Sequence, residues 1–505
     1  NWSTGGVPPA GASILVPNVT NQPTLDQTRT IGSFTLNVGA TADLNGFELT
    51  LTRSLTHDGS IQSNGGTLDF NGSADGQFIY ANTTLDIDNL TIDNSNDVTL
   101  SAGSINLIGT LDLVNGTFNT NNSITLISDA LGTARIAEIV GGSISGDITM
   151  QRYIDAGSTD WRFITSAVSG ATLADMNDDF ITSGFTGSDW PLWPTAANPW
   201  PSIYFYDETV GGTQDNGFNA ATNITNNIAT GEGLWVWSGD TITGTQPFTI
   251  DMTGPPHTGS ISLPMTYTNS GLPSEDGWNM VGNPYPSTLD WDDPSIAQTN
   301  INNAIYIWNP DLQQFGSYVG GIGTNGASNN IASSQAFWVQ ANASSPVLTV
   351  TEASKTSVDG SFLKPTIVLP FRIKATNNYG SDEIAINIEN NATNGFDVQF
   401  DAEKMTSVNT SLPRVASVLN GTEFSINQFP SQELSLPIKI TTDLSGLHLI
   451  EFENASNFGN AACLKLEDLF TGTFYDLNST NSFTAYIYDT TSVARFLLHV
   501  GAQIN

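Results

Sequence analysis

The sequence predicts an all-β protein made of N-terminal β-solenoid-like repeats, two related central β modules and a C-terminal β-sandwich. Three observations predict this class. Short runs alternate apolar and polar residues with a period of two, Asn-Gly and Gly-Gly pairs separate these runs, and no helical period of useful length occurs. The expected boundaries of the four units are 1–154, 155–255, 256–354 and 365–505.

The first unit repeats a small cassette of strand, turn and strand. Its alternating runs, such as 33–38, 47–51 and 85–92, are rich in Ile, Leu and Thr, which is typical of half-buried strands. Many short strands at even spacing fit a sandwich, a barrel or a solenoid. The repetition favours a solenoid, in which each coil buries its face on its neighbours. A Greek-key sandwich is the alternative.

The middle of the chain contains an internal duplication. The run 203–207 (IYFYD) is echoed by 305–309 (IYIWN), and 228–236 (IATGEGLWV) is echoed by 331–339 (IASSQAFWV). The two motifs recur in the same order at nearly the same separation. This pattern predicts two related β modules whose aromatic strands, including Trp235 and Trp338, supply a core.

The last unit shows alternating runs, such as 384–388 and 447–452, that predict a β-sandwich of roughly six to eight strands. Lysine occurs only from Lys355 onward, whereas residues 1–354 contain five arginines and no lysine. Such a step in composition indicates separate units and places a junction near residues 353–365.

The charge of the chain excludes some partners. Its 505 residues carry 14 Lys+Arg against 49 Asp+Glu, a net charge of −35. Such a surface repels polyphosphates and disfavours anionic membranes, so nucleic acid is not expected as a partner. No apolar run is long enough to span a bilayer, so no transmembrane segment is expected. The single cysteine, Cys463, leaves no intramolecular disulfide and no cysteine-based zinc cluster.

Two clusters of aspartates are candidate calcium ligands. They are Asp175, Asp178 and Asp179 in the first module, and Asp290, Asp292 and Asp293 in the second. Calcium takes six to eight hard oxygen ligands, which clustered carboxylates supply. Neither cluster has the spacing of an EF-hand loop, and the alternative is that the carboxylates cap helix ends or turns. Calcium is the one cofactor that the sequence suggests.

Three tryptophans are candidate glycan-binding residues. Trp190, Trp193 and Trp200 alternate with prolines in a segment without strand periodicity. Exposed rings on a stiff loop would stack on sugar faces, whereas the alternative is a packed loop that seals the first module. No nucleophile elbow, phosphate loop or dinucleotide fingerprint is present, and no pair of catalytic carboxylates can be selected from the sequence. We therefore expect a non-enzymatic protein and assign no catalytic residue.

Several motifs carry a resemblance to a known class of proteins. They are 277–287 (GWNMVGNPYPS) followed by 289–292 (LDWD), 151–154 (QRYI), 334–339 (SQAFWV) and 392–397 (ATNGFD). These motifs resemble those of large secreted proteins of the Bacteroidota that the type IX secretion system exports. The resemblance implies an extracellular or cell-surface location and a C-terminal sorting domain that was removed during export. It also implies O-glycosylation at Asp-Thr sequences, such as those at Thr241 and Thr490.

The expected function is therefore that of a secreted, cell-surface structural or adhesive protein. Exposed sheet edges template pairing with other chains, and proteins usually block them with lysine, which the first 354 residues lack. Self-assembly into a fibre or sheath is the leading hypothesis, with self-association or other surface proteins as partners. A carbohydrate-binding surface protein is the second hypothesis. A polysaccharide-active enzyme on the solenoid is the third, and it requires a groove with two facing carboxylates.

Overall fold

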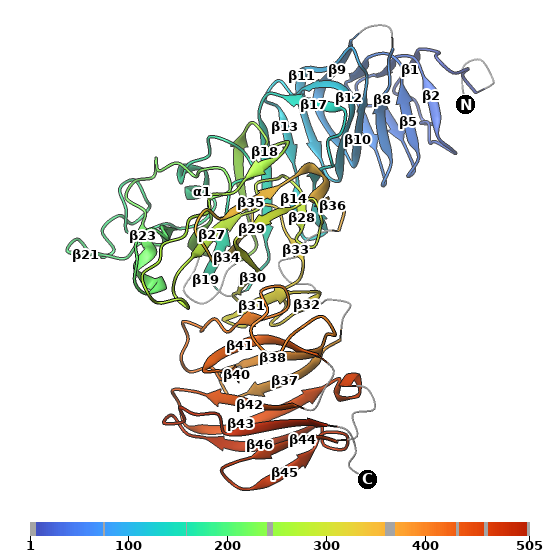
Figure 1. Ribbon diagram of the computed structural model, residues 1–505. Helices are drawn as coiled ribbons and strands as arrows, with labels where there is room; N and C mark the ends of the chain where they lie inside the picture. Colours follow the sequence, from blue (N-terminus) through green and yellow to red (C-terminus); the bar gives the residue numbers. More distant parts are fainter. Residues whose placement is uncertain are drawn as a thin grey trace.

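The computed structural model describes residues 7–73, 76–157, 159–239, 246–358, 369–430, 434–458 and 463–501. It shows three regions in series: a solenoid, a central region of two modules, and a curled C-terminal sheet, arranged in a bent, elongated molecule (Figure 1). Within the described residues the one α-helix is α1 (Ala174–Asn177), and nearly all other regular structure is β. The all-β prediction is confirmed.

The N-terminal region is a β-solenoid of about 6 turns. Parallel ladders run along three faces, and β9, β11 and β12 each turn a corner between faces. The first face contains β1 (Ile14–Val16), β3 (Phe34–Leu36), β6 (Leu55–His57), β9 (Gln77–Ile87), β11 (Val98–Leu107), β12 (Thr110–Asn119) and β17 (Gly142–Ser145). The second contains β2 (Arg29–Ile31), β5 (Glu48–Leu51), β8 (Thr67–Phe70), β10 (Asn89–Asp93), β12 and β16 (Arg135–Ile136). The third contains β4 (Thr41–Asp43), β7 (Ser60–Gln62), β9, β11, β13 (Ile124–Leu126) and β18 (Ile148–Ile154).

The repeated cassette of strand, turn and strand explains why the chain forms stacked coils. Inward positions hold aliphatic residues that stack in rows, such as Leu49, Leu68 and Leu90, and all three are buried. At the corners, Asn-Gly pairs adopt positive φ, for example Asn64 at 48° and Gly65 at 85°, which these residue types tolerate best. Because the pairing is parallel, the alternative of a Greek-key sandwich is wrong, and the solenoid prediction is confirmed.

The first module begins at the last coil and returns to it. β18 pairs along its whole length, antiparallel, with β25 (Phe248–Gly254) at the end of the module. The solenoid core is continuous with one face of the module, since Met150, Ile164, Val168 and Met252 belong to one apolar cluster. This antiparallel strand closes the end of the solenoid, which would otherwise expose unpaired backbone groups.

The two central modules contain related sheets. The first has the order β19 (Asp160–Ile164), β24 (Leu234–Ser238), β22 (Ile203–Tyr206), β23 (Phe218–Ala220). The second has the order β27 (Trp278–Gly282), β34 (Ala336–Ala341), β30 (Ile301–Asn309), β31 (Gln314–Val319), β32 (Ile322–Gly323). Equivalent strands also share their register: Tyr204 is opposite Trp235 in the first sheet, as Tyr306 is opposite Trp338 in the second. The duplicated sequence thus forms a duplicated sheet.

Reciprocal contacts join the two sheets. Ile164 of β19 bridges to Gln335 in the second module, and the equivalent Val281 of β27 bridges to Glu232 in the first. Glu232 and Gln335 occupy equivalent positions in the repeated motif, so the contacts obey an approximate twofold relation. This arrangement merges the aromatic faces of the two sheets into one cluster.

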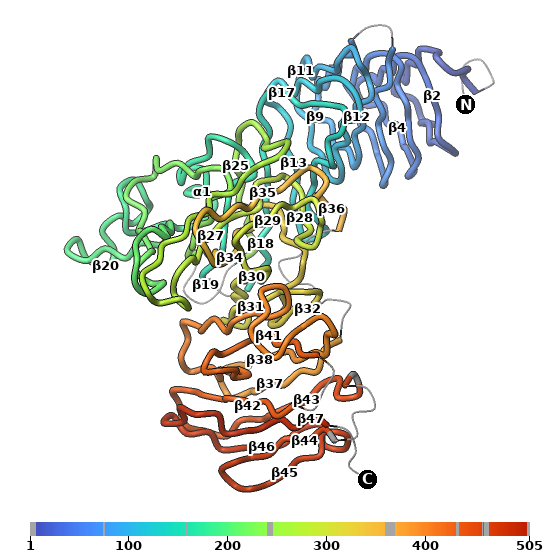
Figure 2. The backbone as a smooth tube through the Cα atoms, in the orientation of Figure 1, coloured from blue at the N-terminus to red at the C-terminus, as the bar shows by residue number. Residues whose placement is uncertain are grey.

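Shorter elements complete the central region. They are β14 (Ser128–Asp129), β15 (Gly132–Thr133), β20 (Pro194–Thr195), β21 (Asn198–Pro199), β26 (Ile261–Ser262), β28 (Thr288–Asp290), β29 (Ala297–Thr299), β33 (Asn330–Ile331), β35 (Val347–Val350), β36 (Lys355–Thr356) and the 3-10 helices η1 (Gln214–Gly217) and η2 (Glu352–Ser354). Figure 2 shows the loop that carries β20 projecting from the central region.

The C-terminal region is one 11-stranded curled sheet. Its strands are β37 (Phe371–Thr376), β38 (Ser381–Ile388), β39 (Ala402–Glu403), β40 (Arg414–Leu419), β41 (Thr422–Phe429), β42 (Leu434–Thr441), β43 (Gly446–Glu453), β44 (Cys463–Asp468), β45 (Thr473–Asp476), β46 (Ser482–Ile487) and β47 (Phe496–Gly501), with the 3-10 helix η3 (Ala455–Phe458). The sheet folds back so that its two edge strands meet: Tyr475 of β45 stacks on Phe483 of β46, with ring centroids 3.8 Å apart. The two packed layers expected of the last unit are therefore formed by a single continuous sheet.

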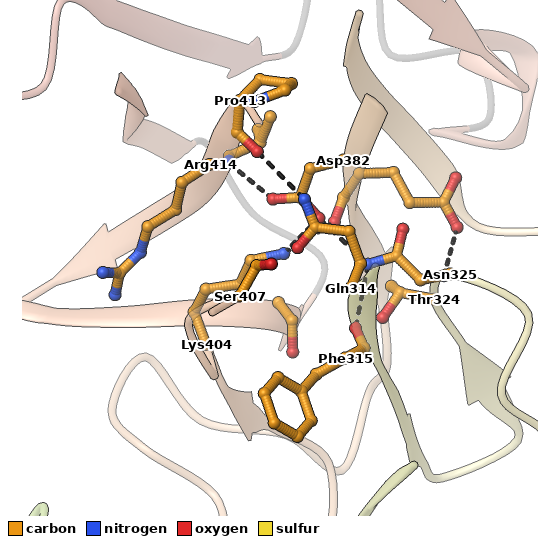
Figure 3. A network of polar contacts seen from close by, with 12 residues as sticks. Gln314, Phe315, Thr324, Asn325, Asp382, Lys404, Ser407, Pro413 and Arg414 are labelled. Carbon is orange, nitrogen blue, oxygen red and sulfur yellow. Dashed lines mark hydrogen bonds and ion pairs between the residues drawn. The ribbon is translucent and has the colours of Figure 1, made fainter. Parts of the chain in front are cut away.

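A buried polar network fixes the curled sheet to the second module (Figure 3). The Asp382 carboxylate accepts hydrogen bonds from Lys404 Nζ at 2.6 Å, Asn325 Nδ2 at 3.0 Å and the Val415 N–H at 2.7 Å. Nearby, Gln314 Nε2 of the module donates to the carbonyl of Pro413 at 3.2 Å. The Lys404–Asp382 ion pair lies within the curled sheet, with side chains 2% and 0% exposed, whereas the bonds from Asn325 and Gln314 join the two regions.

Candidate functional site

The structure brings the three predicted tryptophans together. Trp190 and Trp193 are 51% and 47% exposed, whereas Trp200 is half-buried. The Trp193 ring lies 6.4 Å from Trp190 and 5.8 Å from Trp200, and Trp200 lies 5.7 Å from Trp161 of β19 (centroid distances). The loop therefore exposes two rings and packs the third. Together the rings form a row from the surface to the edge of the first central sheet.

This row ends at a cleft that the sequence did not reveal. The cleft has a volume of about 970 Å³ and lies among the first module, the second module and the curled sheet. Seven aromatic side chains contribute to its lining: Trp161, Tyr204, Phe218 and Trp235 from the first module, and Trp278, Phe315 and Trp338 from the second. The alternating aromatic strands were expected to form core, and Trp235 and Trp338 are indeed buried, but they also form the floor of the cleft.

The two sheets create this surface through their shared register. Trp235 lies at the centre, with ring centroids 4.8 Å from Phe163, 5.8 Å from Phe218 and 5.7 Å from Trp308 of the other module. Edge-to-face and tilted contacts of this kind favour packing between aromatic rings. The rings are therefore held rigidly, and a ligand that contacts them orders few side chains on binding. The internal duplication of aromatic strand pairs is the sequence signal from which this cleft could have been found.

The third wall comes from the curled sheet, and its basic groups have acidic partners of their own. Arg414 Nη2 lies 2.8 Å from Glu423 Oε2, and Lys439 Nζ lies 2.7 Å from Glu423 Oε1. Lys404 is paired with Asp382 in the buried network. The remaining acids of the lining are Asp215, Glu275 and Glu403. The cleft therefore combines aromatic faces with an excess of hydrogen-bond acceptors.

The carboxyl group of Glu403 has a strongly raised pKa. Burial, followed by the charge of the neighbouring Glu275 carboxylate, raises the pKa of Glu403 to about 7. Glu275 itself accepts a hydrogen bond from the Gln214 N–H at 2.9 Å. The two carboxylates thus act on each other at the edge of the aromatic floor.

The first aspartate cluster serves local structure. Asp175 Oδ2 accepts hydrogen bonds from the Thr172 N–H at 2.8 Å and from Thr172 Oγ1 at 3.1 Å, at the start of α1. Asp179 accepts from the Asp251 N–H at 2.9 Å, and burial together with nearby acids raises the pKa of Asp179 to about 7. Asp178 is exposed at the end of the helix.

The second aspartate cluster forms turns. Asp290 accepts from Asn329 Nδ2 at 2.7 Å, Asp292 accepts from the hydroxyl of Tyr318, and Asp293 accepts from the Ser295 N–H at 2.8 Å. In the part of the chain that the structure describes, no three His, Cys, Asp or Glu side chains gather to hold a metal ion. The geometry favours the capping alternative for both clusters, and calcium binding stays a prediction.

The two predicted glycosylation positions differ in what the structure shows. Thr490 is exposed in a turn after β46, as a modified residue must be. Thr241 lies outside the described residues. Among the helices of the described residues, none has the length and apolar character needed to cross a bilayer.

Comparison with known proteins identifies a family. The family model described as "Domain of unknown function (DUF8693)" matches residues 70–499. The chain belongs to this family. The matched region includes the later coils of the solenoid, both central modules and nearly all of the curled sheet, so the whole aromatic cleft lies inside it. No curated protein and no solved structure matches the chain.

Proposed function

We propose that the protein is a secreted, cell-surface adhesive protein that binds neutral glycan chains in the aromatic cleft. The observation that carries the proposal is the lining itself: seven aromatic side chains around about 970 Å³, with acids that exceed the available bases. The C–H faces of a sugar ring stack on aromatic rings, and its hydroxyl groups donate to carboxylates. The volume lies at the upper end for small-molecule sites, so it suits several sugar units.

The tryptophan row supports a chain-like ligand over a single sugar. Trp193 and Trp190 continue outward from Trp161, which lines the cleft. A glycan bound in the cleft can extend along these exposed rings. Each further ring adds contact area at low entropic cost, because an aromatic side chain has only two rotatable bonds.

A glycan array followed by titration calorimetry tests the proposal. We expect neutral oligosaccharides to bind, and longer ones to bind more tightly. Tyr204→Ala should weaken binding about tenfold, because a half-buried ring of the cleft wall is lost. Phe474→Ala is the matched control, since this exposed aromatic lies on β45, away from the cleft, and should leave binding unchanged. No binding to any neutral glycan, or equal affinity in the Tyr204 variant, would overturn the proposal.

Glycoside hydrolysis is a second candidate that one observation favours. A general acid needs a raised pKa and acts with a second carboxylate, and Glu403 has such a pKa, raised by burial and by the charge of the Glu275 carboxylate. If the protein cleaves the glycan that it binds, chromatography will show shorter products, and Glu403→Gln should abolish them while binding persists. If the substrate is still intact after prolonged incubation near pH 6, the protein does not hydrolyse the glycan, and only the binding proposal stands.

Self-assembly remains a further proposal for the same surface protein. Its support is the set of strands at the ends of the sheets: β1 and β2 at the first coil of the solenoid, and β45 and β46 in the curled sheet. Lysine, which commonly prevents such edges from pairing with other chains, is absent from the first 354 residues. Negative-stain microscopy should show filaments that disappear when Thr30 in β2 is replaced by proline. Dispersed monomers of the unaltered protein would exclude assembly.

A further inference from the structure

A second cavity lies between the end of the solenoid and the second module. It has a volume of about 340 Å³, and its lining comes from the β14–β15 hairpin, β18, β19 and the end of β30. It shares no lining residue with the aromatic cleft. Phe163 and Trp308 separate the two, because they line this cavity and pack on Trp235 of the cleft.

Two arginines lie at the base of this cavity. Arg152 and Arg162 are 7% and 6% exposed, and they are two of only five basic residues in the first 354 positions. Arg162 Nη1 donates to Ser238 Oγ at 3.0 Å, and Arg152 Nη1 donates to Thr133 Oγ1 at 3.3 Å. These bonds orient both guanidinium groups in a site of low solvent access, where a positive charge attracts an anion more strongly than at the surface.

Two further donors at the base point to the same kind of ligand. Gln335 is 0% and Trp308 is 2% exposed, yet Gln335 Nε2 and Trp308 Nε1 have no hydrogen-bond acceptor among the described residues. A buried N–H group without an acceptor costs about 1–3 kcal/mol. Both residues belong to the cavity lining, so a ligand with acceptor atoms at its inner end can satisfy these donors if the two side chains turn toward it.

The side-chain amide of Gln335 is a difference between the two modules, because the first module has Glu232 at the equivalent position. Gln335 Oε1 accepts the Ala332 N–H at 3.0 Å, and the equivalent Glu232 Oε2 accepts the Ala229 N–H at 2.9 Å. Both side chains therefore hold the same loop in the same way. Gln335 lines the cavity together with the two arginines and has an amide nitrogen where Glu232 has a second carboxylate oxygen, whereas Glu232 is not part of the lining.

The rim of the cavity has the opposite character. Asp129, Asp155 and Asp311 line it and are exposed. Such carboxylates accept hydrogen bonds from hydroxyl groups at the outer end of a ligand. They also repel a second negative charge, so a doubly charged phosphate is disfavoured.

We propose that this cavity binds a singly charged sugar acid, a uronic acid residue, with its carboxylate inward. The planar carboxylate meets Arg152, Arg162 and the amide of Gln335, and the hydroxyl groups face the aspartates of the rim. A volume of about 340 Å³ suits one such residue. The inference rests on residues outside the aromatic cleft and stands independently of neutral-glycan binding.

Isothermal titration with glucuronic acid, glucose and glucose 6-phosphate tests the assignment. The key variant is Gln335→Glu, which keeps the acceptor for the Ala332 N–H and reproduces the residue of the first module. We expect the unaltered protein to bind glucuronic acid and the variant to bind it at least tenfold more weakly. Glu232→Gln is the matched control and should bind like the unaltered protein.

A rim variant tests the assignment without touching the base. Asp311→Asn changes an exposed residue and should strengthen glucuronic acid binding about two- to threefold, because a repelling charge is removed. Absence of glucuronic acid binding, equal affinity in Gln335→Glu, or equal affinity for glucose would overturn the proposal. Tighter binding of glucose 6-phosphate would overturn the carboxylate assignment.

Discussion

The two central modules have the same strand order and the same register, but their aromatic strands differ in how deeply they are buried. In the second module every residue of β31 is buried, whereas the equivalent β23 of the first module is half-buried or exposed. The same holds for matched residues: Tyr306 is buried and Tyr204 is half-buried. Equivalent strands are thus buried in the second module and partly exposed in the first, although both modules contribute aromatic side chains to the cleft.

The curled C-terminal sheet causes this difference. It packs on the second module, where Ser425 Oγ donates to Ser317 Oγ at 2.8 Å and the Asp382 network is formed. On the first module the corresponding face borders the cleft. Whether an aromatic strand is buried in the core or exposed in the cleft therefore depends on whether the curled sheet covers it. The predictions that follow change residues of the curled sheet, the aromatic rings or the charged groups near them.

The largest effect is expected from Lys404→Met, which breaks a buried ion pair inside the curled sheet. Asp382 would lose its cation, and an unpaired buried charge costs about 3–5 kcal/mol. Asp382 also accepts the bond from Asn325 of the second module, and Lys404 lines the cleft, so the free energy of unfolding and glycan affinity should both fall. Lys439→Met is the control, because its ion pair with Glu423 is more exposed and contributes about 1 kcal/mol or less. Urea denaturation of both variants measures the difference, and equal costs would contradict the larger contribution of the buried pair.

The matched tyrosines test the comparison directly. Tyr306→Ala should lower the free energy of unfolding by about 3–5 kcal/mol, the usual cost of removing a large core aromatic. Tyr204→Ala should cost only about 1–2 kcal/mol, because part of its ring already contacts solvent, but should weaken glycan binding. Denaturation and calorimetry on the two variants check the ranking. Equal losses of stability would mean that the two modules are covered alike.

The raised pKa values of two acids in the curled sheet predict that the stability of the protein depends on pH. Burial raises the pKa values of Glu403 and Asp401 to about 7, well above those of the unfolded chain, near 4. Between these values the folded state binds more protons than the unfolded state, so stability falls as the pH rises from about 4.5 to 7. The melting temperature should be higher at pH 5 than at pH 8, and Glu403→Gln should reduce this difference. A melting temperature that rises over this interval would contradict the assigned pKa values.

The smallest effect on stability is expected at the outer end of the tryptophan row. Trp190→Ala and Trp193→Ala remove rings that are about half exposed, so the free energy of unfolding should change by about 1 kcal/mol or less. Their effect on binding should depend on glycan length. Affinity for long oligosaccharides should fall, and affinity for short ones should not, because only long chains reach beyond Trp161. Equal losses for both lengths would contradict the extended path.

The sequence alone determined the fold class and the duplication. Period-two alternation with Asn-Gly corners specifies short strands, and their even repetition specifies stacked coils, since both signals are local along the chain. The echo of 203–207 in 305–309 likewise predicted related sheets. The sequence left open whether Trp190 and Trp193 are exposed or packed in a sealing loop, and the structure exposes both rings.

Only the tertiary structure decided where the candidate sites lie. Trp161, Trp338 and Glu403 are far apart in sequence, and they line one cleft because two sheets and a third region meet there. Likewise, Gln335 and Glu232 occupy the same position of a repeated motif, and only the tertiary structure places Gln335 in one cavity lining with Arg152 of β18 and Arg162 of β19. Alternation along the sequence indicates which side of a strand is apolar. Which neighbouring element covers that side depends on long-range packing, and this is determined only by the complete fold.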